Sequence, residues 1–314
     1  MKFNYLFTLL FSCLLISILL SCGDDEDTPT IVCDTFTSAD SVCYCNANPE
    51  ELSCRNFSVS VLKSEAPELA TADNGTIWTK GFVIGSSIYI IDRQSDSPHA
   101  FWRLDVDAGG DWERLADFPG NRYGITGAAN GKGYASSYSS NDFWEYDPIN
   151  DEWTQLADLP FFASEMHWVE YKGMFYYPDH DGIFEFNPAT KEWAKISEQT
   201  STWFGGIFLV EDDMYWYNIN HNYMSHFNLT SKTFEEHMLP ADFGWSVSFN
   251  SPIVINNNAF IVIGGSLWTF DNATHTWSFH EDRLTSGFCY ADDVFLIDET
   301  AYIVDNGVVK VFEF

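Results

Sequence analysis

Four histidines stand in segments that we expect to be exposed loops, where an ionisable side chain could act on a ligand. One of them, in Asp179-His180-Asp181, lies between two carboxylates that could orient it as a base or help it to hold a metal ion. A triplet of this kind is more often only a surface turn. The other three are His99, His167 and His221. No two histidines have the spacing of zinc ligands, so the sequence predicts no metal site and no cofactor.

Aromatic residues form a second series of candidates, because one stands near the start of each of six similar segments. They are Trp78, Tyr123, Trp168, Trp203, Trp245 and Phe288. Aromatic rings beside polar side chains present flat apolar faces to sugars or peptides, although the same rings could simply pack between sheets. We favour packing for Trp78 and Phe288, and binding for Tyr123 and Trp203. The predicted ligand-binding residues are Arg93, His99, Arg122, Tyr123, His167, Trp168, His180, Trp203, His221, Tyr223 and Trp245.

Motifs of common enzyme classes are missing from the sequence. It contains no G-x-S-x-G nucleophile elbow, no phosphate-binding loop and no metalloprotease helix. An enzyme needs acid and base groups that converge within about 3 Å of a reacting atom, whereas a binding protein needs only aromatic and hydrogen-bonding groups. We therefore expect a non-catalytic binding protein.

The elements that carry these residues repeat along the chain with a period of about 41 residues. The first marker of the repeat is Leu104, Tyr146, Phe186, Phe227, Phe270 and Phe312. The second marker is Trp112, Trp153, Trp193, Phe234 and Trp277. Each unit predicts four antiparallel strands, which we call a, b, c and d, with the two markers on strands c and d. The second marker should fill the gap between adjacent sheets.

Stacked sheets of this kind bury both of their faces when they are arranged radially, which predicts an all-β, six-bladed β-propeller. The last unit ends after strand c, at about Phe314. Residues 56–63 alternate cleanly between apolar and polar side chains, and we expect them to supply strand d of the last blade. The bc loops and the da connections share one edge of such a ring, where we place the ligand-binding residues; we call it the bc/da rim.

The repeat resembles the kelch family. Tyr146-Asp147-Pro148, Glu152-Trp153-Thr154 and Leu159-Pro160 follow the kelch signature, and Gly264-Gly265 resembles its double glycine. The resemblance implies a kelch propeller over residues 56–314. Some kelch proteins are enzymes, and a sialic acid-type mutarotase or epimerase, or a related carbohydrate enzyme, is the alternative function. Such an enzyme would require several arginines for a carboxylate substrate, and Arg93, Arg122 and Arg283 are the candidates.

The first 21 residues have the character of a targeting signal. Lys2 precedes an apolar run from Leu6 to Leu20 that is shorter than the roughly 20 residues of a membrane span. Leu19-Leu20-Ser21-Cys22 resembles a bacterial lipoprotein signal, which implies that Cys22 becomes lipidated. The acidic run Gly23 to Asp27 resembles the export signal of surface lipoproteins of Bacteroidetes-type bacteria. These resemblances imply an outer-membrane protein exposed on the cell surface, which touches the membrane only through its lipid anchor.

Residues 22–55 are expected to form an acidic tether and a cysteine-rich linker or cap. Four cysteines, Cys33, Cys43, Cys45 and Cys54, fall close together in a segment that we expect to be exported, which favours two disulfides. The pairing is either 33–43 with 45–54 or 33–45 with 43–54, because a bond between Cys43 and Cys45 is sterically poor. A zinc site is a weaker alternative because the spacing lacks a C-x2–4-C knuckle.

The charge of the chain narrows the range of partners. Forty-six acidic residues against 15 Lys and Arg give a net charge of −31, so nucleic acid is not an expected partner. The partner that we expect is a glycan or a protein, bound at the bc/da rim. The protein should act as a monomeric propeller or as a subunit of a surface complex.

Overall fold

The computed structural model places the described residues in a single unit of the chain. The chain divides into two compact units, Met1–Cys54 and Arg55–Phe314. The structure describes residues 58–63, 79–92, 99–121, 123–138, 140–163, 168–199, 206–218, 222–240, 243, 252–263, 266–281, 293–305 and 308–313. The predicted targeting signal, the lipidation site Cys22 and the four clustered cysteines lie outside these residues.

Among the described residues, every regular element is a strand, and the strands form six four-stranded antiparallel sheets. Five sheets, which we call blades 1 to 5, each use four consecutive strands. Blade 1 contains β2 (Thr79–Ile84), β3 (Ser87–Asp92), β4 (Phe101–Asp105) and β5 (Glu113–Arg114). Blade 2 contains β6 (Tyr123–Ala129), β7 (Lys132–Ser137), β8 (Phe143–Asp147) and β9 (Glu152–Gln155). Blade 3 contains β10 (Val169–Tyr171), β11 (Met174–Asp179), β12 (Gly182–Asn187) and β13 (Glu192–Ser197).

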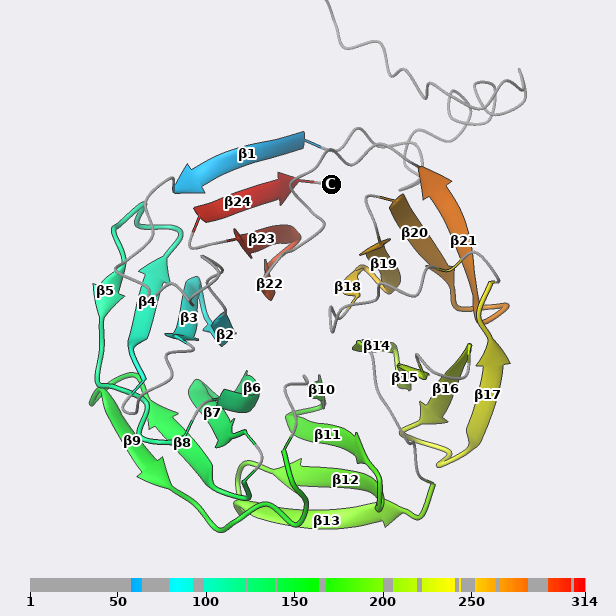
Figure 1. Ribbon diagram of the computed structural model, residues 1–314, viewed down its shortest axis with the longest axis horizontal. Helices are drawn as coiled ribbons and strands as arrows, with labels where there is room; N and C mark the ends of the chain where they lie inside the picture. Colours follow the sequence, from blue (N-terminus) through cyan, green and yellow to red (C-terminus); the bar gives the residue numbers. More distant parts are fainter. Residues whose placement is uncertain are drawn as a thin grey trace, which may run out of the picture. The chain divides into compact units, whose positions relative to one another are not determined.

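The next two blades repeat the same order. Blade 4 contains β14 (Ile207–Val210), β15 (Asp213–Asn218), β16 (Tyr223–Asn228) and β17 (Phe234–Met238). Blade 5 contains β18 (Ile253–Ile255), β19 (Asn258–Ile263), β20 (Ser266–Asp271) and β21 (Thr276–Glu281). Within the unit Arg55–Phe314 the sheets stand around a central axis, with the first strand of each blade innermost (Figure 1). The prediction of an all-β propeller is confirmed.

The remaining sheet, which we call the composite sheet, joins strands from far apart in the sequence. It contains β22 (Asp293–Ile297), β23 (Thr300–Asp305), β24 (Val308–Glu313) and β1 (Ser58–Lys63), with β1 in the outermost position (Figure 1). β1 is antiparallel to β24, so that Val59 lies opposite Phe312 and Val61 opposite Lys310. The segment that alternates in the sequence therefore supplies the fourth strand of this sheet.

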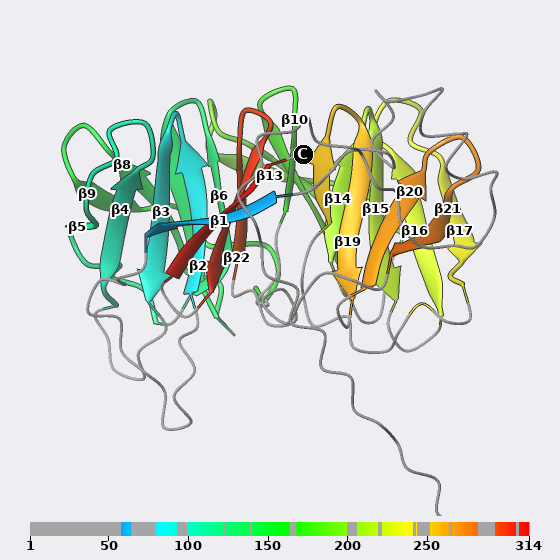
Figure 2. The same cartoon turned by 90° about the horizontal axis from the view of Figure 1, so that it is seen from above.

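The ab and cd turns lie along the edge of the ring opposite the bc/da rim, and we call that edge the ab/cd rim (Figure 2). The same local hydrogen bond forms each of the cd turns. The Asp or Asn that follows the first marker accepts a hydrogen bond from the backbone N–H two residues later, as Asp147 does from Ile149 (2.9 Å) and Asn187 from Ala189 (2.9 Å). Each of these turns then has one residue with a positive φ, four positions after that Asp or Asn, namely Gly109, Asp151, Lys191, Lys232 and His275.

Aromatic packing between neighbouring blades forms the core. The Trp153 ring contacts Phe101 and Phe118 of blade 1, each with 5.0 Å between ring centroids, and its Nε1–H donates to Ala116 O (3.2 Å). The predicted role of the second marker in filling the gap between sheets is confirmed here. Gly127 permits a similar approach, because a Cβ atom at this position would lie 1.7 Å from Nε1 of Trp168. The described residues contain no helix long and apolar enough to cross a membrane.

Candidate functional site

The predicted binding residues divide into those that the structure describes and those that it does not. Arg93, Arg122, His167, Trp203, His221 and Trp245 lie outside the described residues, as does Arg283. The arginines that a carboxylate-binding enzyme would need are therefore not located. Tyr123 begins β6 at the bc/da rim, where its backbone lies opposite Ser137.

Two of the predicted binding residues are buried and require correction. His99 is 1% exposed, and its backbone forms an isolated bridge with Phe118. Burial lowers the pKa of His99, against the opposing effect of Asp92 and Asp117. Trp168 is 7% exposed, and its ring stacks on Phe175 at 4.0 Å between centroids. Both side chains therefore pack within and between blades and present little surface to a ligand.

The Asp179-His180-Asp181 triplet forms the turn between β11 and β12. Asp179 is buried and accepts a hydrogen bond from the backbone N–H of Asp181 (3.2 Å), while His180 and Asp181 are exposed. Burial raises the pKa of Asp179, which is the largest effect on that carboxyl. The hydrogen bond within the triplet is that of an Asx turn, and the turn presents His180 to solvent at the bc/da rim. Tyr223, which begins β16 at the same rim, is partly exposed.

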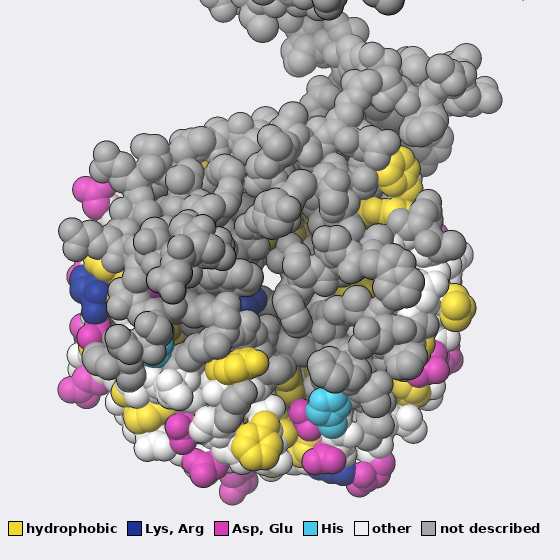
Figure 3. All heavy atoms as spheres, viewed as in Figure 1, with side chains coloured by type: hydrophobic (Ala, Val, Ile, Leu, Met, Phe, Trp, Pro, Cys, Tyr) yellow, Lys and Arg dark blue, Asp and Glu magenta, His cyan; other side chains and the backbone are white. Residues whose placement is uncertain are grey.

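An aromatic residue outside the repeated aromatic series is exposed at this rim. Phe162, in the connection between β9 and β10, is 73% exposed. Its neighbour Phe161 is buried, because the Phe161 ring stacks on Tyr177 of β11 (4.7 Å between centroids, planes 15° apart) and meets Trp193 edge-on at 5.2 Å. The anchored Phe161 holds Phe162 at the surface, and its partner Tyr177 lies near the end of β11, three residues before His180. Figure 3 shows this face of the ring, with hydrophobic, acidic and histidine side chains exposed among the described residues.

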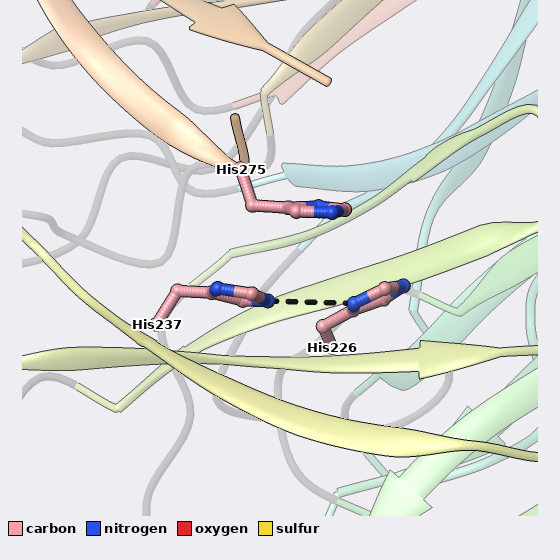
Figure 4. Close-up of side chains that lie close together, drawn as sticks. All are labelled: His226, His237 and His275. Atoms are coloured by element: carbon pink, nitrogen blue, oxygen red, sulfur yellow. Dashed lines mark hydrogen bonds between the residues drawn. The ribbon is translucent and has the colours of Figure 1, made fainter. Parts of the chain in front are cut away.

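A second group of functional side chains lies at the junction of blades 4 and 5. His226 of β16, His237 of β17 and His275, in the turn before β21, each place one ring nitrogen within 4.8 Å of the other two (Figure 4). The pKa of His237 is lowered, first because it is partly buried and then because His275 and His226 would repel its positive charge. Among the described residues, this is the only such group of potential metal ligands.

The spacing of the histidines along the chain does not indicate this cluster, because its members come from two neighbouring strands and from a turn of the next blade. The repeat offers a signal that could have found it. In the hairpin of β16 and β17, His226 lies opposite Glu235 and Met224 lies opposite His237, so the two histidines are diagonal neighbours on one face. His275 stands two residues before the second marker of the next unit, in the turn that faces blade 4.

Comparisons with known proteins agree with this architecture. Residues 133–160 match the kelch motif. The solved structure of YjhT is similar with a TM-score of 0.57 and 13% sequence identity, over 80% of this chain and 95% of that one. A protein of unknown function from Bacteroides thetaiotaomicron is similar with a TM-score of 0.55 and 15% identity, over 82% of this chain and 76% of that one. No curated protein matches the chain. At these identities the similarities show the propeller fold alone.

Proposed function

We propose that the unit Arg55–Phe314 is a non-catalytic module that binds a glycan or a protein at its bc/da rim. The observation that carries the proposal is the exposed Phe162, held outward by the buried Phe161 beside the turn of His180. An exposed aromatic ring on a rigid base can cover the apolar face of a sugar ring at little entropic cost. Histidine and aspartate in the neighbouring turn supply hydrogen-bond partners.

The fold itself favours recognition at this rim. Buried Phe161 anchors the described part of the connection between β9 and β10, so that a ligand would meet a Phe162 side chain that is already positioned. The bc and da connections differ in length from blade to blade, whereas the ab and cd turns are short and alike. A binding surface that varies on a constant scaffold is the usual arrangement in repeat proteins.

Two single substitutions at the rim test the proposal. The full chain should be applied to a glycan array and to immobilised surface-protein fractions, together with Phe162→Ala and His180→Ala. We expect Phe162→Ala to lose most of the binding and His180→Ala to lose part of it, because the ring supplies apolar contact and the imidazole a hydrogen bond. A glycan hit and a protein hit distinguish the two ligand classes.

The matched control is Ile149→Ala, since Ile149 is 88% exposed but lies in a cd turn on the opposite edge of the ring. It should bind as the unchanged chain does. Retention of full binding by both rim variants, or equal loss in the Ile149 variant, would refute recognition at this rim.

We also propose that the protein is exported and held at the bacterial cell surface by a lipid on Cys22. The support is the apolar run that ends at Leu20-Ser21-Cys22 and the acidic residues after it. Cells fed a radiolabelled fatty acid should label the chain, and Cys22→Ser should abolish the label. Protease treatment of intact cells should degrade the unchanged chain; survival of the chain until the cells are lysed would contradict surface exposure.

A further inference from the structure

The three histidines at the junction of blades 4 and 5 approach one another through their ring nitrogens. His237 Nε2 lies 3.4 Å from His226 Nδ1 (Figure 4). Two imidazole nitrogens bound to the same tetrahedral zinc ion, each at about 2.0–2.1 Å, would be separated by roughly 3.3 Å. The His275 ring lies over both others, with centroids 4.8 Å from His226 and 4.6 Å from His237. The first pair already has the separation of two zinc ligands, and one ring nitrogen of His275 lies within 4.8 Å of both.

Hydrogen bonds on the far side of His226 set its tautomer and direct the lone pair of Nδ1 toward His237 Nε2. Asp213 Oδ1 lies 2.7 Å from His226 Nε2, and a carboxylate can only accept, so that Nε2 carries the proton and Nδ1 has the lone pair. Asn228 Nδ2 donates to the same carboxylate oxygen (2.6 Å) and holds it in place. A carboxylate that orients a metal-binding histidine through its other nitrogen is a common feature of metal sites.

His275 is oriented in the same way. The hydroxyl of Tyr215 lies 2.8 Å from Asn272 Oδ1 and 2.8 Å from His275 Nδ1. Because the amide oxygen can only accept, the hydroxyl hydrogen points to Asn272, and His275 Nδ1–H donates to the tyrosine oxygen. The lone pair of His275 is then on Nε2. Two of the three rings therefore have tautomers that are set by neighbouring side chains.

The equivalent junction between blades 2 and 3 shows how the repeat normally uses these positions. Glu145 there occupies the position of His226, directly before the first marker, and Lys191 occupies the position of His275, with a similar positive φ. Lys191 Nζ donates to Glu145 Oε1 at 3.1 Å, so opposite charges join the two blades. At the junction of blades 4 and 5 both members of the pair are histidines, which cannot form an ion pair with each other but can share a cation.

We propose that His226, His237 and His275 form a binding site for a divalent transition-metal ion of the zinc class, with Asp213 and Tyr215 as positioning residues. Neutral imidazole nitrogens are ligands that zinc and its neighbours in the first transition series prefer, and calcium and magnesium do not. The carboxylate of Glu235, 3.8 Å from His237 Nε2, or a water molecule would take the fourth position. A bound ion would link blade 4 to blade 5, as the ion pair of Glu145 and Lys191 links blade 2 to blade 3 at the equivalent junction.

The test is calorimetric titration of the full chain with Zn²⁺, after alkylation of the cysteines so that thiolates cannot compete. We expect one ion per chain, a rise in melting temperature with added Zn²⁺, and no response to Mg²⁺. Titration with Co²⁺ should give ligand-field absorption without thiolate charge-transfer bands, which identifies nitrogen and oxygen ligands.

The variants are chosen so that the propeller still folds. His237→Ala, at a partly exposed position, should abolish binding, and so should His275→Asn, because asparagine tolerates the positive φ of that turn. Asp213→Asn should weaken the affinity by about 10- to 100-fold. Lys191→Asn, at the equivalent position of blade 3, is the matched control and should bind Zn²⁺ normally. The absence of saturable binding in the alkylated chain, or unchanged binding in both histidine variants, would overturn the proposal.

Discussion

The two rims of the ring are built by different rules. On the ab/cd rim the turns are nearly identical, because the same Asx hydrogen bond and the same positive-φ position recur, as at Asp147 and Asp151. On the bc/da rim the connections differ in length, and in the one between β9 and β10 a buried Phe161 stands beside an exposed Phe162.

The turns of the ab/cd rim therefore belong to the constant scaffold, and the connections of the bc/da rim are the part that varies. The repeated turns determine where each blade meets the next, so a changed side chain in such a turn alters a junction and leaves the ring intact. The unequal connections carry side chains that no other blade provides.

On the bc/da rim, the loss of stability on substitution should depend on how deeply the side chain is buried. Phe143, the first residue of β8, is fully buried against Tyr134, Phe186 and Trp193. Phe143→Ala should lower the free energy of unfolding by about 3–5 kcal/mol, because a large cavity would remain. Phe162→Ala, on the same rim, should change it by no more than about 0.5 kcal/mol. Urea denaturation measures both; equal losses would mean that Phe162 is a core residue.

A turn residue of the ab/cd rim should have an intermediate effect. The carboxylate of Asp151 accepts hydrogen bonds from the backbone N–H of Ala116 in blade 1 (3.0 Å) and from the Tyr146 hydroxyl (2.8 Å). Asp151→Ala should cost about 1–2 kcal/mol, because it removes both bonds and places alanine at a positive φ. Asp151→Asn should cost less, and Asp158→Ala, at an exposed position, should be neutral in the same denaturation assay.

Mild acid should lower the stability of the fold by protonating His99, which lies on the bc/da rim. The pKa of His99 is lowered by burial, so the unfolded chain binds the proton more readily than the folded one. The stability contributed by the neutral side chain is therefore complete above about pH 6.5 and falls as the pH drops below that value towards the folded pKa. His99→Gln should flatten this part of the stability profile, which denaturation between pH 7 and pH 5 would measure. An unchanged slope would show that other groups control it.

Stronger acid should lower the stability of the fold by protonating Asp147, which lies on the ab/cd rim. Hydrogen bonds from Lys132, first, and from the backbone of Ile149 lower the pKa of Asp147 to about 2 from 3.8. This group stabilises the fold above its unfolded pKa, and the contribution is lost as the pH falls from about 4 to about 2. The stability difference between the unchanged chain and Asp147→Asn should shrink over that interval. A constant difference would exclude Asp147 as the titrating group.

The sequence predicted the elements well because the period of the repeat encodes them. Markers such as Trp153 and turn residues such as Asp147 recur at fixed intervals, and the alternation in residues 56–63 predicted the strand that the structure has at Ser58–Lys63. The burial of His99 and Trp168 could not be predicted, because alternation indicates which face a side chain lies on and not what the adjacent blade places against it. The histidine cluster combines two strands of blade 4 with a turn of blade 5. The spacing of residues along the chain does not indicate that these elements meet.

The pairing of β1 with β24 also has a consequence for synthesis on the ribosome. β1 is the first described strand to emerge and β24 the last, and in an antiparallel pair they complete the same sheet. Blades 1 to 5 can assemble one after another as their strands appear, each from contacts close in the sequence. β1 has to remain without its partner until the rest of the unit has been made. The pairing of β1 with β24 joins residues far apart in the sequence, so we expect this closure to form late in folding.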